Sequence, residues 1–177
     1  MIYPNANIKC TNARYKTIIA STRKESITME AHNDANYKIF SDGAGQENGI
    51  GSAAMLYWKG RSGHIKTLQA VWFLQNSPEM TGKRVSLYTD NHSIIDTLSS
   101  YRATSGQYLI NTFRLAANTL GCRLKIRWIS GHSKVKGDEA ANQLAKRVAA
   151  GCSSAMNNLS HIPLGCASQE ALCNPSW

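Results

Sequence analysis

The order of periodic segments constrains this sequence most, because four strand patterns come first and helical patterns follow them. Residues 37–45, 49–58, 64–74 and 84–91 are rich in β-branched and aromatic residues, as strands are. Short glycine-containing turns separate the first three. Three consecutive strands joined in this way predict an antiparallel meander.

The second part of the chain changes to helical spacing. Residues 93–101, 107–120 and 138–150 repeat apolar residues at helical intervals. Residues 123–130 lie between the last two helices and alternate apolar with basic residues, which predicts a half-buried strand. The complete order predicts an α/β fold in which a mixed five-stranded sheet, a meander followed by parallel strands, is flanked by helices.

The domain organisation follows from where the periodicity begins and ends. The chain has 177 residues, of which 42% are hydrophobic and 18% charged, and this suits one globular domain. We expect the domain at residues 37–150, a polar lead-in or linker at 1–36 and a poorly ordered tail at 151–177.

The chain is basic, with a net charge of +9 and a pI near 9.5. Residues 37–150 hold fifteen Lys and Arg against seven Asp and Glu, so the excess belongs to the expected domain. Such a charge favours a polyanionic partner, although a basic, soluble surface is the simpler alternative. Charge alone does not separate nucleic acid from acidic lipid.

The cysteines and the apolar segments limit where the protein works. Five cysteines without a C-x-x-C pair indicate neither a disulfide framework nor a zinc module, so we expect a reducing compartment. No apolar run reaches the ~18 residues of a membrane span, and the first residues do not resemble a signal peptide. We expect an intracellular monomer, nuclear or cytoplasmic, without a membrane partner.

Two acids occupy the ends of predicted strands. Asp42 follows an apolar strand and precedes Gly43 and Gly45, and Asp90 ends the fourth strand in the same manner. An Asp that opens a turn is the simpler interpretation. If the two strands are neighbours, however, the carboxylates could meet, and paired carboxylates are suited to binding Mg²⁺.

Three segments carry a resemblance to a known family. SDGAG (41–45), YTDN (88–91) and WISGHSKVKGDEAANQLAK (128–146) resemble the type 1 ribonuclease H domain, especially the version in fungal non-LTR retrotransposons. The similarity covers roughly residues 37–150. It implies a ribonuclease H-like fold and Mg²⁺-dependent hydrolysis, with Mn²⁺ as a possible substitute, of the RNA strand in RNA–DNA hybrids.

The resemblance also implies roles for individual residues. In the family, four carboxylates hold two metal ions; the first matches Asp42, the third matches Asp90, and the fourth falls on Asn142. The loop histidine of the family, which assists proton transfer or product release, matches His132. The implied catalytic residues are therefore Asp42, Asp90, His132 and Asn142, and those implied to hold metal are Asp42, Asp90 and Asn142.

This chain departs from the family at two of the four acids. The second acid belongs to the first helix, but residues 68–83 number only sixteen, fewer than the roughly 20 that a strand, a loop and a helix need. We therefore expect a shortened first-helix region, with Val71 in place of that acid and Glu79 as a solvated residue. Asn142 is neutral, and Asp138, one helical turn earlier, is expected at the helix end although it could approach the site.

These departures predict that catalysis is greatly reduced or absent. The alternatives are a module that binds hybrid or double-stranded nucleic acid without cutting it, and a decayed retrotransposon fragment. Several basic side chains could contact nucleic acid, although for each alone a solvated surface role is the simpler interpretation: Lys59, Arg61 and Lys66 in the first hairpin, Arg102, and Lys134 and Lys136 in the histidine loop. Among the polar turn residues, Asn91 beside Asp90 is the best candidate for a contact with a 2′-hydroxyl.

Overall fold

The computed structural model describes residues 14–46, 49–58, 61–65, 74, 78–100 and 107–151, with the backbone alone for 61–65. Its strands are β1 (Tyr15–Ile18), β2 (Tyr37–Gln46), β3 (Gly49–Trp58), β4 (Arg61–Ile65), β5 (Arg84–Thr89) and β6 (Arg123–Trp128). Its helices are α1 (Arg23–Ala31), the 3₁₀ helix η1 (Pro78–Met80), α3 (His92–Ser99), α4 (Gln107–Asn118) and α5 (Lys136–Ala149).

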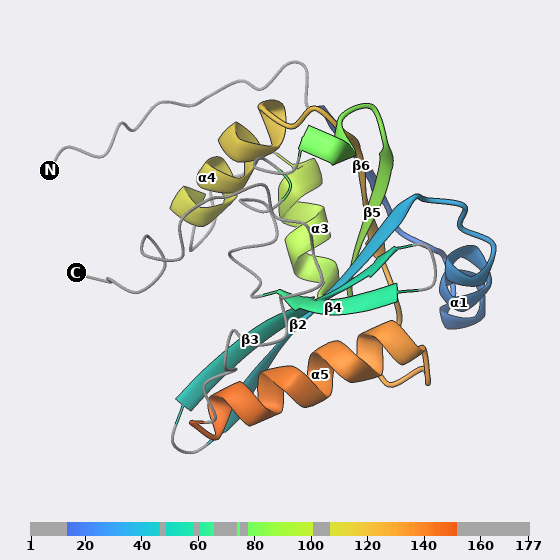
Figure 1. Ribbon diagram of the computed structural model, residues 1–177. Helices are drawn as coiled ribbons and strands as arrows, with labels where there is room; N and C mark the ends of the chain where they lie inside the picture. Colours follow the sequence, from blue (N-terminus) through green and yellow to red (C-terminus); the bar gives the residue numbers. More distant parts are fainter. Residues whose placement is uncertain are drawn as a thin grey trace, which may run out of the picture.

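The strands form one mixed sheet in the order β1-β6-β5-β2-β3-β4 (Figure 1). β2, β3 and β4 are antiparallel neighbours, which confirms the predicted meander. β5 pairs in parallel with β2, β6 with β5, and β1 with β6. The predicted mixed α/β sheet is therefore confirmed, and β1 adds a sixth strand at its edge.

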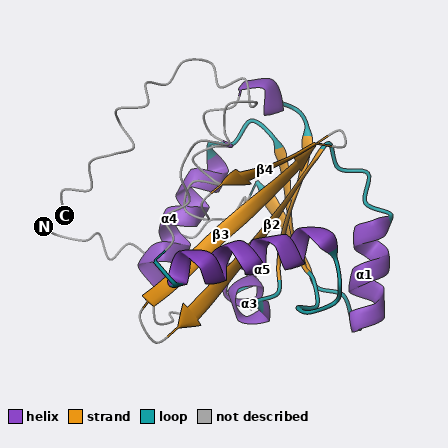
Figure 2. Ribbon diagram, turned by 60° about the horizontal axis from the view of Figure 1, so that its bottom comes forward, coloured by secondary structure: helices purple, strands orange, loops and turns teal. Residues whose placement is uncertain are grey.

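Successive residues of the central strands pack into two separate hydrophobic cores, because side chains alternate between the two faces of a strand. Ile39 belongs to the core that includes Leu98 of α3 and Ala117 of α4. Its neighbour Phe40 points to the opposite face and packs in the core that includes Ala141 of α5. Figure 2 shows α5 crossing β2 and β3, and in Figure 1 α5 lies below these strands whereas α3 and α4 lie above them. The sheet therefore has helices on both faces.

The predicted linker at residues 1–36 is wrong for the part that the structure describes. Tyr15 on β1 is buried, its ring meets Phe113 edge-on at 5.7 Å, and its hydroxyl donates to the Leu98 carbonyl at 3.3 Å. The α1 helix follows, and its Ile27 packs against the same core as α5. The folded body thus begins more than twenty residues earlier than the periodicity indicated, and residues 1–13 lie outside the described part.

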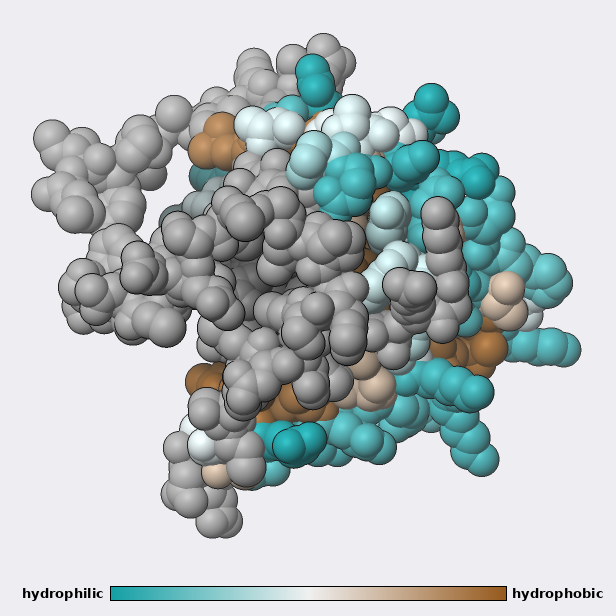
Figure 3. Space-filling view, in the orientation of Figure 1, coloured by the Kyte–Doolittle hydropathy of each residue, from teal (hydrophilic) through white to brown (hydrophobic). Residues whose placement is uncertain are grey.

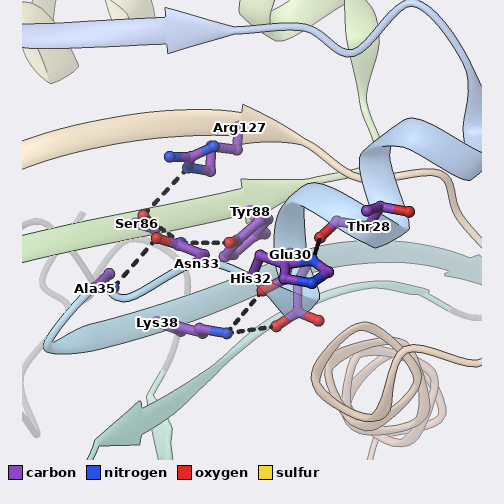
Figure 4. A network of polar contacts seen from close by, with 9 residues as sticks. All are labelled: Thr28, Glu30, His32, Asn33, Ala35, Lys38, Ser86, Tyr88 and Arg127. Atoms are coloured by element: carbon purple, nitrogen blue, oxygen red, sulfur yellow. Dashed lines mark hydrogen bonds and ion pairs between the residues drawn. The ribbon is translucent and has the colours of Figure 1, made fainter.

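A polar network fastens the segment after α1 to the sheet (Figure 4). The Asn33 amide donates to the Ser86 hydroxyl at 2.8 Å and to the Tyr88 hydroxyl at 2.5 Å. Lys38 on β2 makes a 2.9 Å ion pair with Glu30 on α1. Because Ser86 and Tyr88 are each only 1% exposed, these contacts satisfy groups that solvent does not reach.

The remaining element boundaries are close to prediction. The third predicted strand corresponds to β4, which begins at Arg61 and not at residue 64. Residues 66–73 lie outside the described part. Val71 and the shortened first-helix region therefore stay predictions. Glu79 in η1 is exposed and adds to the raised pKa of Tyr37, at the opposite end of β2 from Asp42. Its predicted solvated role is confirmed.

Residues 152–177, the predicted tail, also lie outside the described part. Among the cysteines that the structure describes, Cys122 is a buried free thiol. Within the described ranges, no helix combines the length and the apolar character needed to cross a membrane.

Candidate functional site

Asp42 lies where β2 stops pairing with β5. The parallel register ends with Ser41 opposite Thr89, whereas the antiparallel pairing with β3 continues through Asp42 to Gln46. The prediction that Asp42 ends its strand is therefore wrong: the glycines after it remain in β2. Asp42 instead marks the point where β2 leaves its parallel neighbour.

Asp90 comes directly after β5, as predicted, and follows Thr89, the register partner of Ser41. Since the register pairs Phe40 with Tyr88, the residues two positions on, Asp42 and Asp90, belong to the same face of the sheet. The Phe40 and Tyr88 rings stack at 4.7 Å, which holds the two strands in register immediately before the acids. Both carboxylates are half-buried.

The loop after β6 closes against Asp90. The Trp128 indole donates from Nε1 to the Asp90 carbonyl at 3.1 Å. A Cβ atom at Gly131 would lie 2.7 Å from Asp90 Oδ2, so a larger residue at this loop position would displace the Asp90 carboxylate. The loop that contains Gly131 and His132 of the sequence motif therefore packs directly against Asp90.

His132 and Lys134 occupy the tip of this loop in the left-handed backbone region, with φ of +54° and +60°. Both side chains are exposed. A residue other than glycine in this conformation costs on the order of 1 kcal/mol or more, so its surroundings must hold it there. Such strain is common in segments that position functional side chains.

The α1 helix supplies part of that support. Arg23 donates from Nη2 to the His132 carbonyl at 2.6 Å, and the Ser130 N–H donates to the Ser26 hydroxyl at 3.2 Å. Ser26 is 2% exposed. The sequence interpretation missed both α1 residues, although Thr22 and Glu25 carry the S/T-x-x-E pattern of a helix start, and Thr22 does cap α1.

The α5 helix brings Asp138 and Asn142 to the same region. Both are buried, with exposed fractions of 4% and 9%, and they lie one helical turn apart. The N-cap of α5 is Val135, which makes no side-chain capping bond. Asp138 lies in the first turn of α5, as expected, but it is buried there and does not face solvent.

Burial and neighbouring charges raise the pKa values of two acids at this site, Asp42 and Asp138. Burial raises the pKa of Asp42, and the charge of Asp90 adds to the rise; the Gly43 N–H, His132 and Lys146 act in the opposite direction. Burial, then the charges of Asp90, Asp42 and Glu139, raise the pKa of Asp138 to about 6 against a partial offset from His132. Asp138 therefore lies within electrostatic reach of both acids.

Lys146 is a further residue that the sequence interpretation did not assign to the site. It is exposed on α5, one turn beyond Asn142, and it favours the charged form of Asp42. The motif contained Lys146, but its position over the sheet depends on the path of α5. Figure 3 shows hydrophilic residues gathered over α5 along the lower edge of the molecule.

The predicted nucleic-acid contacts are only partly described. Lys134 and Lys136 are exposed at the histidine loop and the start of α5. Asn91 is also exposed, and its Oδ1 caps α3 by accepting from the Ile94 N–H at 3.2 Å. The side chains that lie outside the described part are Lys59, Arg61, Lys66 and Arg102.

The donor types at this site suit a hard divalent cation. Carboxylate and amide oxygens are the ligands that Mg²⁺ prefers, and it retains several waters and uses substrate phosphate as well. Within the described ranges, no three His, Cys, Asp or Glu side chains are grouped closely enough to hold a metal ion by themselves. The carboxyl of Asp138 is buried and has no hydrogen-bond partner among the described residues.

Comparison with known proteins leaves the family of this chain open. None of the models of protein families matches the sequence, and no curated protein is similar enough to be a relative.

Proposed function

We propose that this chain is a ribonuclease H-type domain that binds RNA–DNA hybrids and hydrolyses their RNA strand slowly, with Mg²⁺ as the cofactor. One observation carries the proposal: β2 and β5 run in parallel and present Asp42 and Asp90 on the same sheet face, beside the histidine loop. The resemblance of the three sequence segments to the ribonuclease H domain supplies the substrate class.

Asp42, Asp90 and Asn142 would hold the cation. When bound, Mg²⁺ would supply the Lewis acidity that activates a water and stabilises the leaving oxygen of a phosphodiester. The two carboxylates already oppose each other's ionisation, since the charge of Asp90 contributes to the raised pKa of Asp42. A cation relieves that repulsion, so the electrostatics of the site favour occupancy.

The remaining side chains would position substrate and move protons. His132 is exposed at the loop tip and lies within electrostatic reach of Asp42, so its ring can exchange a proton with the leaving group or with solvent. Lys134 and Lys136 extend into solvent from the same loop and can bind phosphates of the backbone. The Asn91 amide is suited to a 2′-hydroxyl, which distinguishes RNA from DNA.

Asn142 explains why hydrolysis should be slow. Its amide supplies a neutral oxygen where the family has an anion, and a missing charge weakens the hold on a dication by several kcal/mol at short range. The same observation favours a second function, in which the domain binds a hybrid without cutting it.

A cleavage assay separates these functions. The full chain is incubated with a hybrid whose RNA and DNA strands carry different labels, with Mg²⁺ or EDTA, beside Asp42→Asn and the exposed-acid control Asp34→Asn. We expect slow, Mg²⁺-dependent cuts in RNA alone that vanish in Asp42→Asn. Binding that weakens with rising salt but gives no cuts would establish the non-cleaving function. Neither binding nor cleavage would overturn both.

A further inference from the structure

The basic residues of β6 lie on the face of the sheet that α1 and α5 cover in part. Arg127 donates from Nε to the Ser86 hydroxyl at 3.3 Å, the same hydroxyl that accepts from the Asn33 amide (Figure 4). Because side chains alternate along a strand, Arg123 and Lys125 share this face with Arg127. A row of three cations therefore follows β6, with about 6.6 Å between neighbours along the strand.

The strands on either side of β6 widen this row into a patch. Lys125 is the register partner of Lys16 on β1, and Arg123 is the register partner of Arg84 on β5. Partners on neighbouring strands stand about 4.8 Å apart, and like charges at this spacing destabilise a sheet. The three strands contain no acidic residue. Their five basic residues form the basic sheet patch: Lys16, Arg84, Arg123, Lys125 and Arg127.

The basic sheet patch is open to solvent. Four of its side chains are exposed, and the fifth, Arg127, is half-buried. The α5 helix packs on β2 and β3, and the segment after α1 contacts β5, whereas the basic residues of β6 remain accessible. Within the described ranges, Arg84 makes an exposed ion pair with Asp34, and no acid pairs with the other four cations. Soluble domains normally intersperse charges of both signs, so this arrangement favours an anionic partner.

The patch extends away from the candidate nuclease site. Arg127 is level with Tyr88, and Arg123 and Arg84 begin their strands. Arg84 precedes Asp90 by six residues, about 20 Å along β5. An anion bound over the whole patch would therefore reach well beyond the acids and the histidine loop.

The shape and chemistry of the patch fit a phosphate backbone. Evenly spaced cations match a polymer that carries a charge at every unit, and arginine presents a planar fork of donors to phosphate. Proteins that bind an acidic membrane surface usually add exposed apolar side chains that enter the lipid. The apolar residues of β1, β5 and β6 on this face are Ile18 and Tyr88, and neither is exposed.

We propose that the basic sheet patch binds the phosphate backbone of nucleic acid without regard to base sequence, as a contact surface in addition to the acids and the histidine loop. The patch raises the affinity for nucleic acid and takes no part in hydrolysis. This inference goes beyond the proposed function, because it requires neither a metal ion nor cleavage.

The test uses the full chain and a labelled RNA–DNA hybrid in EDTA, with binding followed by fluorescence anisotropy between about 50 and 200 mM salt. The patch variant is Arg123→Gln with Lys125→Gln, and Lys16→Gln with Lys125→Gln is a second one. Lys24→Gln with Arg147→Gln is the matched control, because it also removes one Arg and one Lys from exposed positions. Thermal unfolding without nucleic acid should give midpoints for both patch variants no lower than that of the control, since removing a like charge relieves repulsion.

For each patch variant we expect an affinity at least about tenfold lower at low salt, with the same loss for a hybrid of unrelated sequence and a salt dependence smaller by about two phosphate contacts. The control should lose less than about threefold. Equal affinities and salt dependences in the patch variants and the control would overturn the inference. Loss of binding to phosphatidylserine vesicles with hybrid binding intact would assign the patch to acidic lipid and would also overturn it.

Cleavage at saturating hybrid in Mg²⁺ separates this inference from the proposed function. The patch variants should cut RNA at the rate of the unchanged protein, whereas Asp42→Asn should lose cleavage and keep the contribution of the patch to binding. If the unchanged protein cuts RNA but the patch variants bind as the control does, the inference fails and the proposed function stands. If the patch variants lose affinity but the unchanged protein does not cut, the inference stands and the proposed hydrolysis fails.

Discussion

Gly137 lies on the ring of Phe40 so closely that a Cβ atom on Gly137 would stand 2.6 Å from Phe40 Cγ. The ring has no room to withdraw, because it stacks on Tyr88 and meets Tyr57 edge-on at 5.6 Å. This contact sets the start of α5 at a fixed height above β2. The position of Asp138 relative to Asp42 depends on it.

Gly137→Ala should therefore destabilise the protein by about 1–3 kcal/mol, through forced displacement of the helix from the ring. Helix propensity alone predicts the reverse, a gain of up to about 1 kcal/mol. Urea unfolding measures the difference. Gly45→Ala is the control, because nothing lies within 4 Å of an added Cβ there. A variant at position 137 as stable as the control would contradict the close packing.

The raised pKa of Asp138 predicts a pH-dependent stability. Because this pKa is about 6 when folded and 3.8 ordinarily, the folded protein holds the proton more tightly than the unfolded chain. The protonated Asp138 carboxyl contributes fully to the free energy of unfolding below about pH 4. This contribution is lost as the pH rises past about 6, a loss of about 3 kcal/mol at most.

Asp138→Asn should remove the part of the pH-dependent decline in stability that comes from ionisation of Asp138. Denaturant unfolding in EDTA, measured from pH 5 to pH 7.5, should show a smaller decline in the variant than in the unchanged protein. The raised pKa of Asp42 acts with the same sign and leaves a residual slope. Parallel curves for the two proteins would mean that Asp138 ionises as freely when folded as when unfolded.

Arg23 should hold the histidine loop in place. Arg23→Ala removes the donor to the His132 carbonyl, and the strained backbone at His132, with φ of +54°, then depends on the remaining bonds made by Ser130 and Ser133. We expect the amides of residues 131–134 to exchange at least about tenfold faster, because local opening requires less free energy. Lys24→Ala, an exposed change in the same helix, is the control. Equal exchange rates of these amides in the two variants would mean that α1 does not hold the histidine loop in place.

Asn33 should be the main polar connection between the N-terminal segment and the sheet. Asn33→Ala leaves the buried hydroxyls of Ser86 and Tyr88 without this donor, and we expect a loss of about 1–3 kcal/mol in urea unfolding. Asp34→Ala removes only an exposed ion pair with Arg84 and should cost less than about 1 kcal/mol. The prediction fails if the two variants unfold together.

Much of the sheet could be predicted from the sequence because its strand patterns are strong. The β1 strand could not, since its YKTI segment has four residues and becomes buried only through Phe113 and Leu98, distant in the chain. The α1 helix was missed for a related reason: its surface is largely polar, and its buried residue is a serine. Its start was nevertheless marked by the Thr22 and Glu25 pattern.

The site divides in the same way. Asp42, Asp90 and His132 could be found because they stand in short, specific motifs beside strand ends and a glycine. The burial of Asp138 could not be predicted, because an acid in a first helical turn normally interacts with solvent and the helix dipole. Only the packing of Gly137 on Phe40 shows that this turn faces the sheet. The glycines after Asp42 misled likewise: they indicated a turn, yet they remain within β2.

The proposed function makes Asp42, Asp90 and Asn142 a nuclease site in which the neutral Asn142 weakens catalysis. The most direct measurement compares RNA-strand cleavage by Asn142→Asp with that by Gln143→Asp, which adds the same charge at an exposed neighbouring position. We expect Mg²⁺-dependent cleavage at least about tenfold faster in Asn142→Asp, because an anion replaces a neutral ligand where charge develops. Equal rates in the two variants would contradict the proposed function.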